Sequence, residues 1–132
     1  MEINRTDVVD EVRSAFAAYE ASLMANDVAA LDRFFWNDAL VVRYGIAENL
    51  YGAGAIAAYR RSCAPPPPRE LQHTVITTFG QDIGVASTEY RSHGTTTTGR
   101  QSQTWARLEE GWRIVAAHVS LQQPSEGAQR CR

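Results

Sequence analysis

The first part of the chain repeats apolar side chains with the period of an α-helix. After a candidate cap at Asn4 or Thr6, apolar residues at spacings of three and four mark one helical face: Val9, Val12, Phe16, Tyr19 and Leu23. Asn26 and Asp27 interrupt this pattern, and Asp27 is a suitable cap for a second helix over residues 28–36. The pattern therefore predicts a long first helix followed by a short one.

The middle of the chain combines one strand with a third helix. The β-branched and aromatic stretch 40–44, with the sequence LVVRY, predicts a strand that ends at Gly45. Turn residues at 51–54 lead into a helix over residues 55–63. The proline run 65–68 must end that helix, because proline cannot continue the helical hydrogen bonds.

The second half of the chain changes to a period of two. Strands are predicted over residues 70–79, 83–92, 100–109 and 112–121, with glycine-containing turns between them. Three helices beside one antiparallel sheet belong to the α+β class. A strongly curved sheet wrapped over the long first helix would form a cone with one mouth, and a cone of this kind holds a pocket between helix and sheet.

These elements predict one domain over residues 1–121, followed by a flexible tail over 122–132. The chain has 132 residues, of which 44% are hydrophobic and 21% charged, as in ordinary globular proteins. Its N-terminus is polar and acidic, and no apolar run is long enough to span a bilayer, so we expect a cytoplasmic protein without a membrane partner. The net charge of −2 argues against nucleic acid as a partner.

Two polar side chains stand out on faces that should point into the cone. Tyr19 shares the buried face of the first helix, where a phenol needs a hydrogen-bond partner, although a core tyrosine with a satisfied hydroxyl gives the same pattern. Arg43 lies in the middle of an apolar strand and needs a carboxylate if it is buried. Glu48 is close enough in sequence to supply that carboxylate; the alternative is a ligand carboxylate, which a guanidinium binds with two parallel hydrogen bonds.

The last two strands add further candidates. By strict alternation, His118 and Ser120 share one face of the final strand, and Gln103 and Trp105 share one face of the strand before it. An aromatic wall with amide groups suits a small polar ligand, while a structural histidine and a solvent-facing glutamine row are the alternatives. The final strand is apolar on both faces, so its outer face is expected to form a homodimer contact.

The sequence carries no signature of a metal or cofactor site. His73, His93 and His118 fall on separate elements, and Cys63 and Cys131 have no metal-binding or redox spacing. A phosphate loop, a dinucleotide fingerprint and a nucleophile elbow are also missing. An enzyme with this sequence is therefore expected to work without a cofactor or metal.

Three segments resemble a known family over residues 5–121: FFWNDALVVRYGIAENLYGAGAIAAYRR, TTFGQDIGVASTEY and GRQSQTWARLEEGWRIVAAHVSL. The element order resembles the NTF2-like cone of the SnoaL-like polyketide cyclases and ketosteroid isomerases. The segments resemble the HpxZ/AtzH-like family of oxalurate and cyanuric acid catabolism. This resemblance implies a decarboxylating amidohydrolase that converts 1,3-dicarboxyurea to allophanate in nitrogen-compound catabolism, with an amidase-signature enzyme as a possible pathway partner.

The family's implicated tyrosine and arginine fall on Tyr19 and Arg43 by motif position. An N-carboxylate loses CO2 readily once its nitrogen is protonated, so such a site needs a cation for the carboxylate and a proton donor near the nitrogen. The resemblance therefore implies that Arg43 holds the carboxylate and that Tyr19 donates the proton. Five further residues are expected to bind the substrate: Glu48, Gln103, Trp105, His118 and Ser120.

Two other functions remain open at the level of sequence. A non-catalytic accessory domain would bind a carboxylated metabolite or the partner amidase, with Arg43 holding the ligand. A ketosteroid-isomerase-like enzyme would need a buried acid, for which Asp38 and Glu48 are the candidates near the first strand. Arg43 beside them favours an anionic ligand instead.

Overall fold

The computed structural model describes residues 1–124, which form three helices and one six-stranded sheet. The elements follow one another as α1 (Thr6–Met24), α2 (Val28–Phe34), β1 (Val42–Tyr44), β2 (Asn49–Tyr51), α3 (Ala53–Ser62), β3 (Arg69–Phe79), β4 (Ile83–Ser92), β5 (Gly99–Leu108) and β6 (Gly111–Leu121). Cys131 and most of the expected tail lie outside the described residues. Within them, no helix has both the length and the apolar character needed to cross a membrane.

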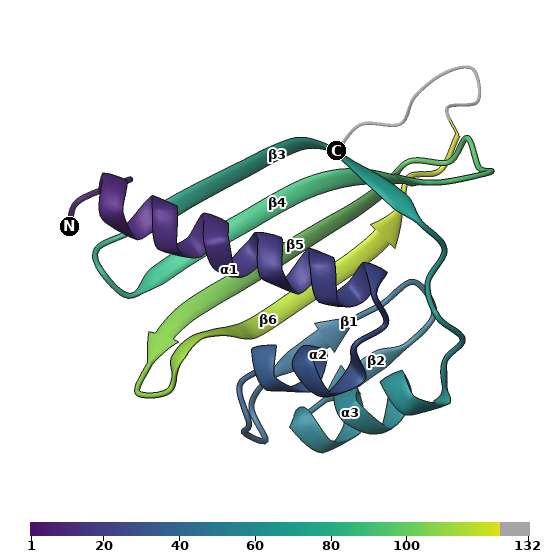
Figure 1. Ribbon diagram of the computed structural model, residues 1–132, viewed down its shortest axis with the longest axis horizontal. Coiled ribbons are helices and arrows are strands. Elements are labelled where there is room, and N and C mark those ends of the chain that lie inside the picture. Colours follow the sequence, from purple (N-terminus) through teal and green to yellow (C-terminus); the bar gives the residue numbers. More distant parts are fainter. Residues whose placement is uncertain (125–132) are drawn as a thin grey trace, which may run out of the picture.

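The sheet has the strand order β2-β1-β6-β5-β4-β3, and only the β1–β6 pair is parallel. Figure 1 shows α1 running across one face of the long strands, with α2 and α3 beside the short strands β1 and β2. The α+β class with a curved sheet over a long first helix is therefore confirmed. The four long strands begin and end within one residue of their predicted limits.

The buried face of α1 fixes that helix on the sheet. Val8, Val12, Phe16 and Tyr19 are each at most 5% exposed, so Val8 takes the place that the periodicity gave to Val9. Gly84 on β4 lies directly beneath Val12, and a Cβ at that glycine would press against its methyl groups. The close approach of helix and sheet therefore depends on a residue without a side chain.

The hairpin of β1 and β2 was not predicted. Gly45 donates its backbone N–H to the carbonyl of Glu48 at 2.8 Å, which turns the chain back and pairs Arg43 with Leu50. A three-residue strand is too short to show alternation in the sequence. Gly52, with φ of 90°, then begins α3 two residues earlier than expected.

Two of the expected helix caps have different outcomes. Asp27 caps α2 as predicted, with its carboxylate accepting from the Ala30 N–H at 3.2 Å. At the start of α1, the cap position is Arg5, which makes no side-chain cap. Asn4 instead accepts from the backbone N–H of Thr78 at 2.9 Å and ties the N-terminus to β3.

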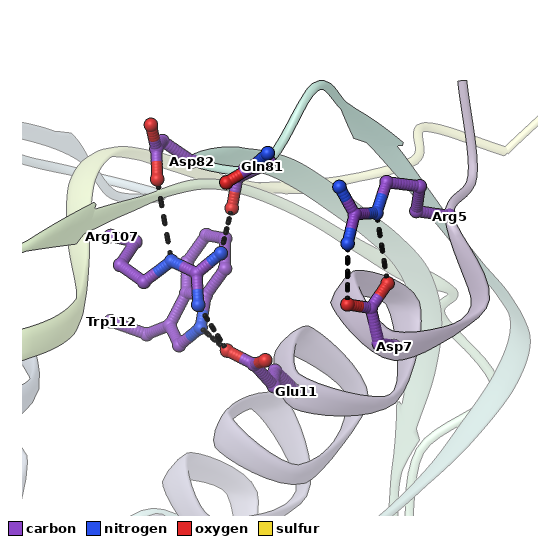
Figure 2. A network of polar contacts seen from close by, with 7 residues as sticks. All are labelled: Arg5, Asp7, Glu11, Gln81, Asp82, Arg107 and Trp112. Atoms are coloured by element: carbon purple, nitrogen blue, oxygen red, sulfur yellow. Dashed lines mark hydrogen bonds and ion pairs between the residues drawn. The ribbon is translucent and has the colours of Figure 1, made fainter. Parts of the chain in front are cut away.

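A polar cluster joins the first half of α1 to two hairpin turns (Figure 2). Arg107 donates to the carboxylate of Glu11 at 2.9 Å, to Asp82 at 3.3 Å and to the carbonyl of Gln81 at 2.6 Å. Trp112 donates its indole N–H to the same Glu11 oxygen at 2.9 Å. The cluster therefore fixes the helix against the β3–β4 turn and the β5–β6 hairpin.

Candidate functional site

A cavity of about 500 Å³ lies between the helices and the sheet. Its wall includes residues of α1, α3 and the strands β1, β3, β4, β5 and β6. Tyr19, Gln103 and Ile56 line it and are each at most 4% exposed, whereas Ile46 and Leu121 line it and are 59% and 42% exposed. The buried residues mark the closed end of the cavity and the exposed ones mark its mouth.

Two of the three arginines that line the cavity have carboxylate partners. Arg43 donates from Nη1 to Oε2 of Glu48 at 2.8 Å. Arg69 donates from Nε and Nη2 to the two oxygens of Glu20 at 2.9 and 2.7 Å, and its guanidinium lies 4.4 Å from the ring centre of Tyr90. These two cations are therefore neutralised within the protein.

The third arginine, Arg60, is different. Its Nη2 donates to the hydroxyl of Tyr19 at 3.3 Å, and its guanidinium lies 6.0 Å from the ring centre of Phe35. Within residues 1–124 it has no carboxylate at ion-pair distance, and its buried Nε has no hydrogen-bond partner. Arg60 is thus a cation whose charge the cavity does not balance.

Aromatic rings hold Tyr19 in place at the closed end. Its ring packs edge-to-face against Phe34, Phe35 and Trp105, with ring centres 5.7, 6.0 and 6.5 Å apart. The residue is 4% exposed, and its hydroxyl meets Arg60. Because arginine has only donors, the Tyr19 oxygen accepts this bond, and the phenolic proton remains available for another group.

Two glutamines give the sheet wall donor groups. Trp105 Nε1 donates to Oε1 of Gln103 at 3.1 Å, and Arg69 Nη2 donates to Oε1 of Gln101 at 3.0 Å. The indole of Trp105 and the guanidinium of Arg69 can only donate hydrogen bonds, so each glutamine must turn its amide oxygen toward them. The NH2 group of each amide is then left without a partner from these residues. The NH2 of Gln101 is buried and has no partner in the described part of the chain.

The charge pair on the β1–β2 hairpin is closely packed. Glu48 lies against Gly45, where a Cβ atom would collide with the carboxylate, so the missing side chain of the glycine allows this close approach. Burial alone raises the pKa of Glu48, but hydrogen bonds from Arg43 and the Ala47 N–H outweigh it and hold the pKa below its ordinary value. Glu48 is therefore a carboxylate at neutral pH.

Two tyrosines in the wall stay protonated. A hydrogen bond to Cys63, together with burial and the charge of Glu48, raises the pKa of Tyr59 to about 12. Burial also raises the pKa of Tyr90. Both side chains face the cavity as neutral phenols and add to its hydrogen-bonding groups.

The structure brings some of the expected site residues together. Tyr19, Arg43 and Gln103 line the same cavity, and Glu48 is the partner of Arg43. Trp105 is fully buried behind the wall, where it supports two residues that line the cavity, Gln103 by a hydrogen bond and Tyr19 by ring packing. Among residues 1–124, no group of three or more His, Cys, Asp or Glu side chains is placed to hold a metal ion.

The expected placement of His118 and Ser120 in the cavity is wrong. Thr104 pairs with Ala116, but the next residue of β5 pairs with Ile114, so one extra residue of β6 forms a bulge between them. A bulge exchanges the two faces of a strand, which strict alternation cannot show. Beyond it, the cavity is lined by Ala117, Val119 and Leu121.

His118 therefore points to the other face of the sheet. It is exposed and packs edge-to-face against Tyr44, with ring centres 5.6 Å apart. Tyr44 packs in the same way against Tyr51 on β2, with ring centres 6.0 Å apart. This aromatic group belongs to the outer surface on which the homodimer contact is expected.

The sequence interpretation missed Arg60, Tyr59 and Arg69 as cavity residues. Helical spacing could have found the first, because Arg60 lies four residues after the buried Ile56 and therefore on the same face of α3. Arg60 and Arg61 are adjacent and chemically identical in the sequence. The structure separates them, since Arg61 points to Asp32 on α2 at 3.2 Å.

Comparison with known proteins places the chain in a family. The model of the AtzH-like family matches residues 1–125. The chain belongs to the AtzH-like family. No curated protein sequence matches it.

Solved structures agree with this assignment. A protein of unknown function from Pectobacterium atrosepticum is 52% identical, with a TM-score of 0.90 over 92% of this chain and 95% of that one. A cystatin-like fold protein from Burkholderia xenovorans is also 52% identical, with a TM-score of 0.89 over 92% and 96%. An NTF2-like protein of unknown function from Pseudomonas putida is 16% identical, with a TM-score of 0.73 over 88% and 87%, and shares the fold. This AtzH-like chain therefore has the NTF2-like fold.

Proposed function

We propose that this AtzH-like protein is a decarboxylating amidohydrolase that acts on a small carboxylated urea or amide, such as 1,3-dicarboxyurea. The observation that carries the proposal is the meeting of Tyr19 with an unbalanced guanidinium at the closed end of a cavity that Arg43 also lines. Such a site offers cations for carboxylates and a positioned proton donor, the two groups that loss of CO2 from nitrogen requires.

The reaction would proceed in one balanced step. The bond between nitrogen and the carboxylate carbon breaks, its electron pair stays on nitrogen, and CO2 leaves. The nitrogen takes a proton from Tyr19, so that 1,3-dicarboxyurea becomes allophanate. Arg60 beside the hydroxyl stabilises the phenolate that forms, and solvent returns the proton to it.

The internal ion pair affects how a doubly charged substrate would bind. Arg43 is already held by Glu48, so a substrate carboxylate must share that guanidinium or displace Glu48. Arg60 presents no such competition within the described residues. We therefore assign the first carboxylate contact to the Tyr19 end and the second to Arg43.

The size of the cavity widens the substrate class. Its volume of about 500 Å³ falls in the range of roughly 300–1,000 Å³ that holds drug-sized ligands, and exceeds the volume of a urea with two carboxylates. Leu50, Ile56 and Val119 add apolar wall. The proposal accordingly includes ureas and amides with a larger apolar substituent.

Turnover of 1,3-dicarboxyurea by purified variants tests the proposal. Y19F and R43A should each lower the rate of allophanate formation by about 100-fold or more, the usual effect of losing a positioned proton donor or charge. Y44F is a matched control, because it removes the same hydroxyl from the outer face. Full activity of Y19F or R43A would contradict the proposal.

The same cavity would also serve a non-catalytic accessory domain that works with an amidase-signature enzyme. Arg43 and Arg69 already pair with carboxylates of the protein, so within the described part of the chain Arg60 is the one cavity arginine left to bind an anion. A pocket with one such cation suits simple binding of a carboxylate, which favours this second function. Calorimetry that shows carboxylate binding without formation of product, or co-purification with the amidase, would support it over the enzyme.

A further inference from the structure

Two polar atoms of the cavity wall are buried and have no hydrogen-bond partner within residues 1–124. Both are N–H donors. They are Nε of Arg60 and the amide nitrogen of Gln101. A buried donor without a partner is unfavourable, and each such group in a folded protein requires an explanation, of which a missing ion or ligand is one. A ligand that completes this wall must therefore supply acceptor oxygens.

The charges around the cavity lead to the same chemistry. Three guanidiniums line it, and the carboxylates of Glu20 and Glu48 neutralise two of them. One positive charge remains, and it lies on Arg60. An anion with a single charge balances the cavity without moving any internal pair.

We propose that Arg60 is the carboxylate anchor of this cavity and that its ligand is a monocarboxylate of a urea or amide, bound with its carboxylate beside Tyr19. The uncommitted NH2 groups of Gln101 and Gln103 on the sheet wall match the carbonyl oxygen of such a ligand. That the protein converts this ligand to a product depends on the proposed function being right. That the protein binds the ligand does not depend on it.

The position of Arg60 on α3 allows a matched comparison. Arg60 faces the cavity, whereas the neighbouring Arg61 pairs with Asp32 and has a side chain that is 64% exposed. Both residues lie in the last turn of the same helix, so R60Q and R61Q change the charge and the helix equally. R60Q removes a guanidinium from the cavity wall, whereas R61Q removes one from the outside of the helix.

Calorimetry with two probes tests the anchor. N-carbamoylglycine carries one carboxylate and a urea group, and its amide, N-carbamoylglycinamide, has the same shape without the charge. The wild-type protein should bind the carboxylate more tightly than the amide. R60Q should weaken carboxylate binding by about 10- to 100-fold, as expected for a lost charge-assisted hydrogen bond, and leave amide binding unchanged. R61Q should leave both unchanged, and R60K should fall between R60Q and wild type.

Three results would overturn the anchor: equal weakening of both probes by R60Q, wild-type affinity of R60Q for the carboxylate, and a wild-type protein that fails to bind N-carbamoylglycine at millimolar concentration. The first of these is the result expected from a purely structural arginine. A wild-type protein that binds the carboxylate through Arg60 but forms no product from any carboxylated urea would instead contradict only the proposed function.

Discussion

Arg60 and Tyr19 meet at the closed end of the cavity, with Nη2 of the arginine 3.3 Å from the hydroxyl of the tyrosine. The two residues are 41 positions apart and come from different helices, α3 and α1. The arginine is the donor, so the contact turns the phenolic proton toward other groups. This pair gives the cavity a cation and a proton donor in one place.

Removing the internal carboxylate of Glu48 should change which anions bind. E48Q frees Arg43 and raises the positive charge around the cavity by one. Affinity for malonate and succinate should rise by roughly 10-fold relative to N-carbamoylglycine, measured by calorimetry.

A second variant should break the Arg43–Glu48 ion pair without removing the Glu48 carboxylate. G45A places a methyl group where the Glu48 carboxylate lies and should displace it from Arg43, with the same gain for dicarboxylates. E109Q removes a charge from an exposed position and serves as the control. Unchanged selectivity in both E48Q and G45A would show that the Glu48 pair does not restrict the cavity.

The pKa of Glu48 predicts one part of the acid stability. Its folded pKa lies below the ordinary value of 4.5, so the folded protein binds fewer protons at this site than the unfolded chain. This contribution to the free energy of unfolding is complete above pH 4.5 and is lost as the pH falls through the lower folded value. Urea denaturation between pH 6 and 3 should show a shallower loss of stability in E48Q than in E109Q. Equal slopes would contradict the pKa shift.

The outer position of His118 predicts that it does not bind ligand within the cavity. H118A should bind N-carbamoylglycine with wild-type affinity, while Q103A, which removes an amide from the cavity wall, should weaken binding. Sedimentation of H118A would show in addition whether the outer face carries a subunit contact. Loss of ligand binding in H118A without a change of assembly would contradict the register of β6.

The cluster around Arg107 predicts an effect on stability alone. R107A removes contacts to the β3–β4 turn and to α1, and should lower the free energy of unfolding by about 1–2 kcal/mol, since the side chain is 34% exposed and solvent screens the charges. R5A breaks the exposed Arg5–Asp7 pair in the same part of the molecule and should have a smaller effect. Reduced affinity for N-carbamoylglycine in R107A would mean that the cluster also shapes the cavity.

The sequence predicts the frame of the molecule because the long elements repeat their apolar residues many times. Val12, Phe16 and Tyr19 mark the buried face of α1 unambiguously, and the confirmed long strands follow from the same repetition. The short strand β2 offers three residues and no such signal. Periodicity therefore predicts the sheet wall and the first helix, but not the hairpin that carries Arg43 and Glu48.

The cavity was harder to predict because the direction of its polar side chains depends on a strand bulge and on helix packing, which the spacing of apolar residues does not reveal. One extra residue in β6 moves His118 to the outer face, and a strand pattern contains no mark of that bulge. Arg60 and Arg61 look alike in sequence, and only the packing of α3 against α2 decides that the second one meets Asp32. Tyr19, in contrast, was predictable because it continues the face of a long helix.

A crystal structure of the protein with bound N-carbamoylglycine would show directly whether Arg60 anchors the carboxylate. We expect one ligand molecule at the closed end, with its carboxylate on Arg60, the hydroxyl of Tyr19 within hydrogen-bonding distance and the Arg43–Glu48 pair intact. A carboxylate on Arg43 with Glu48 displaced, or a ligand bound outside the cavity, would contradict this expectation.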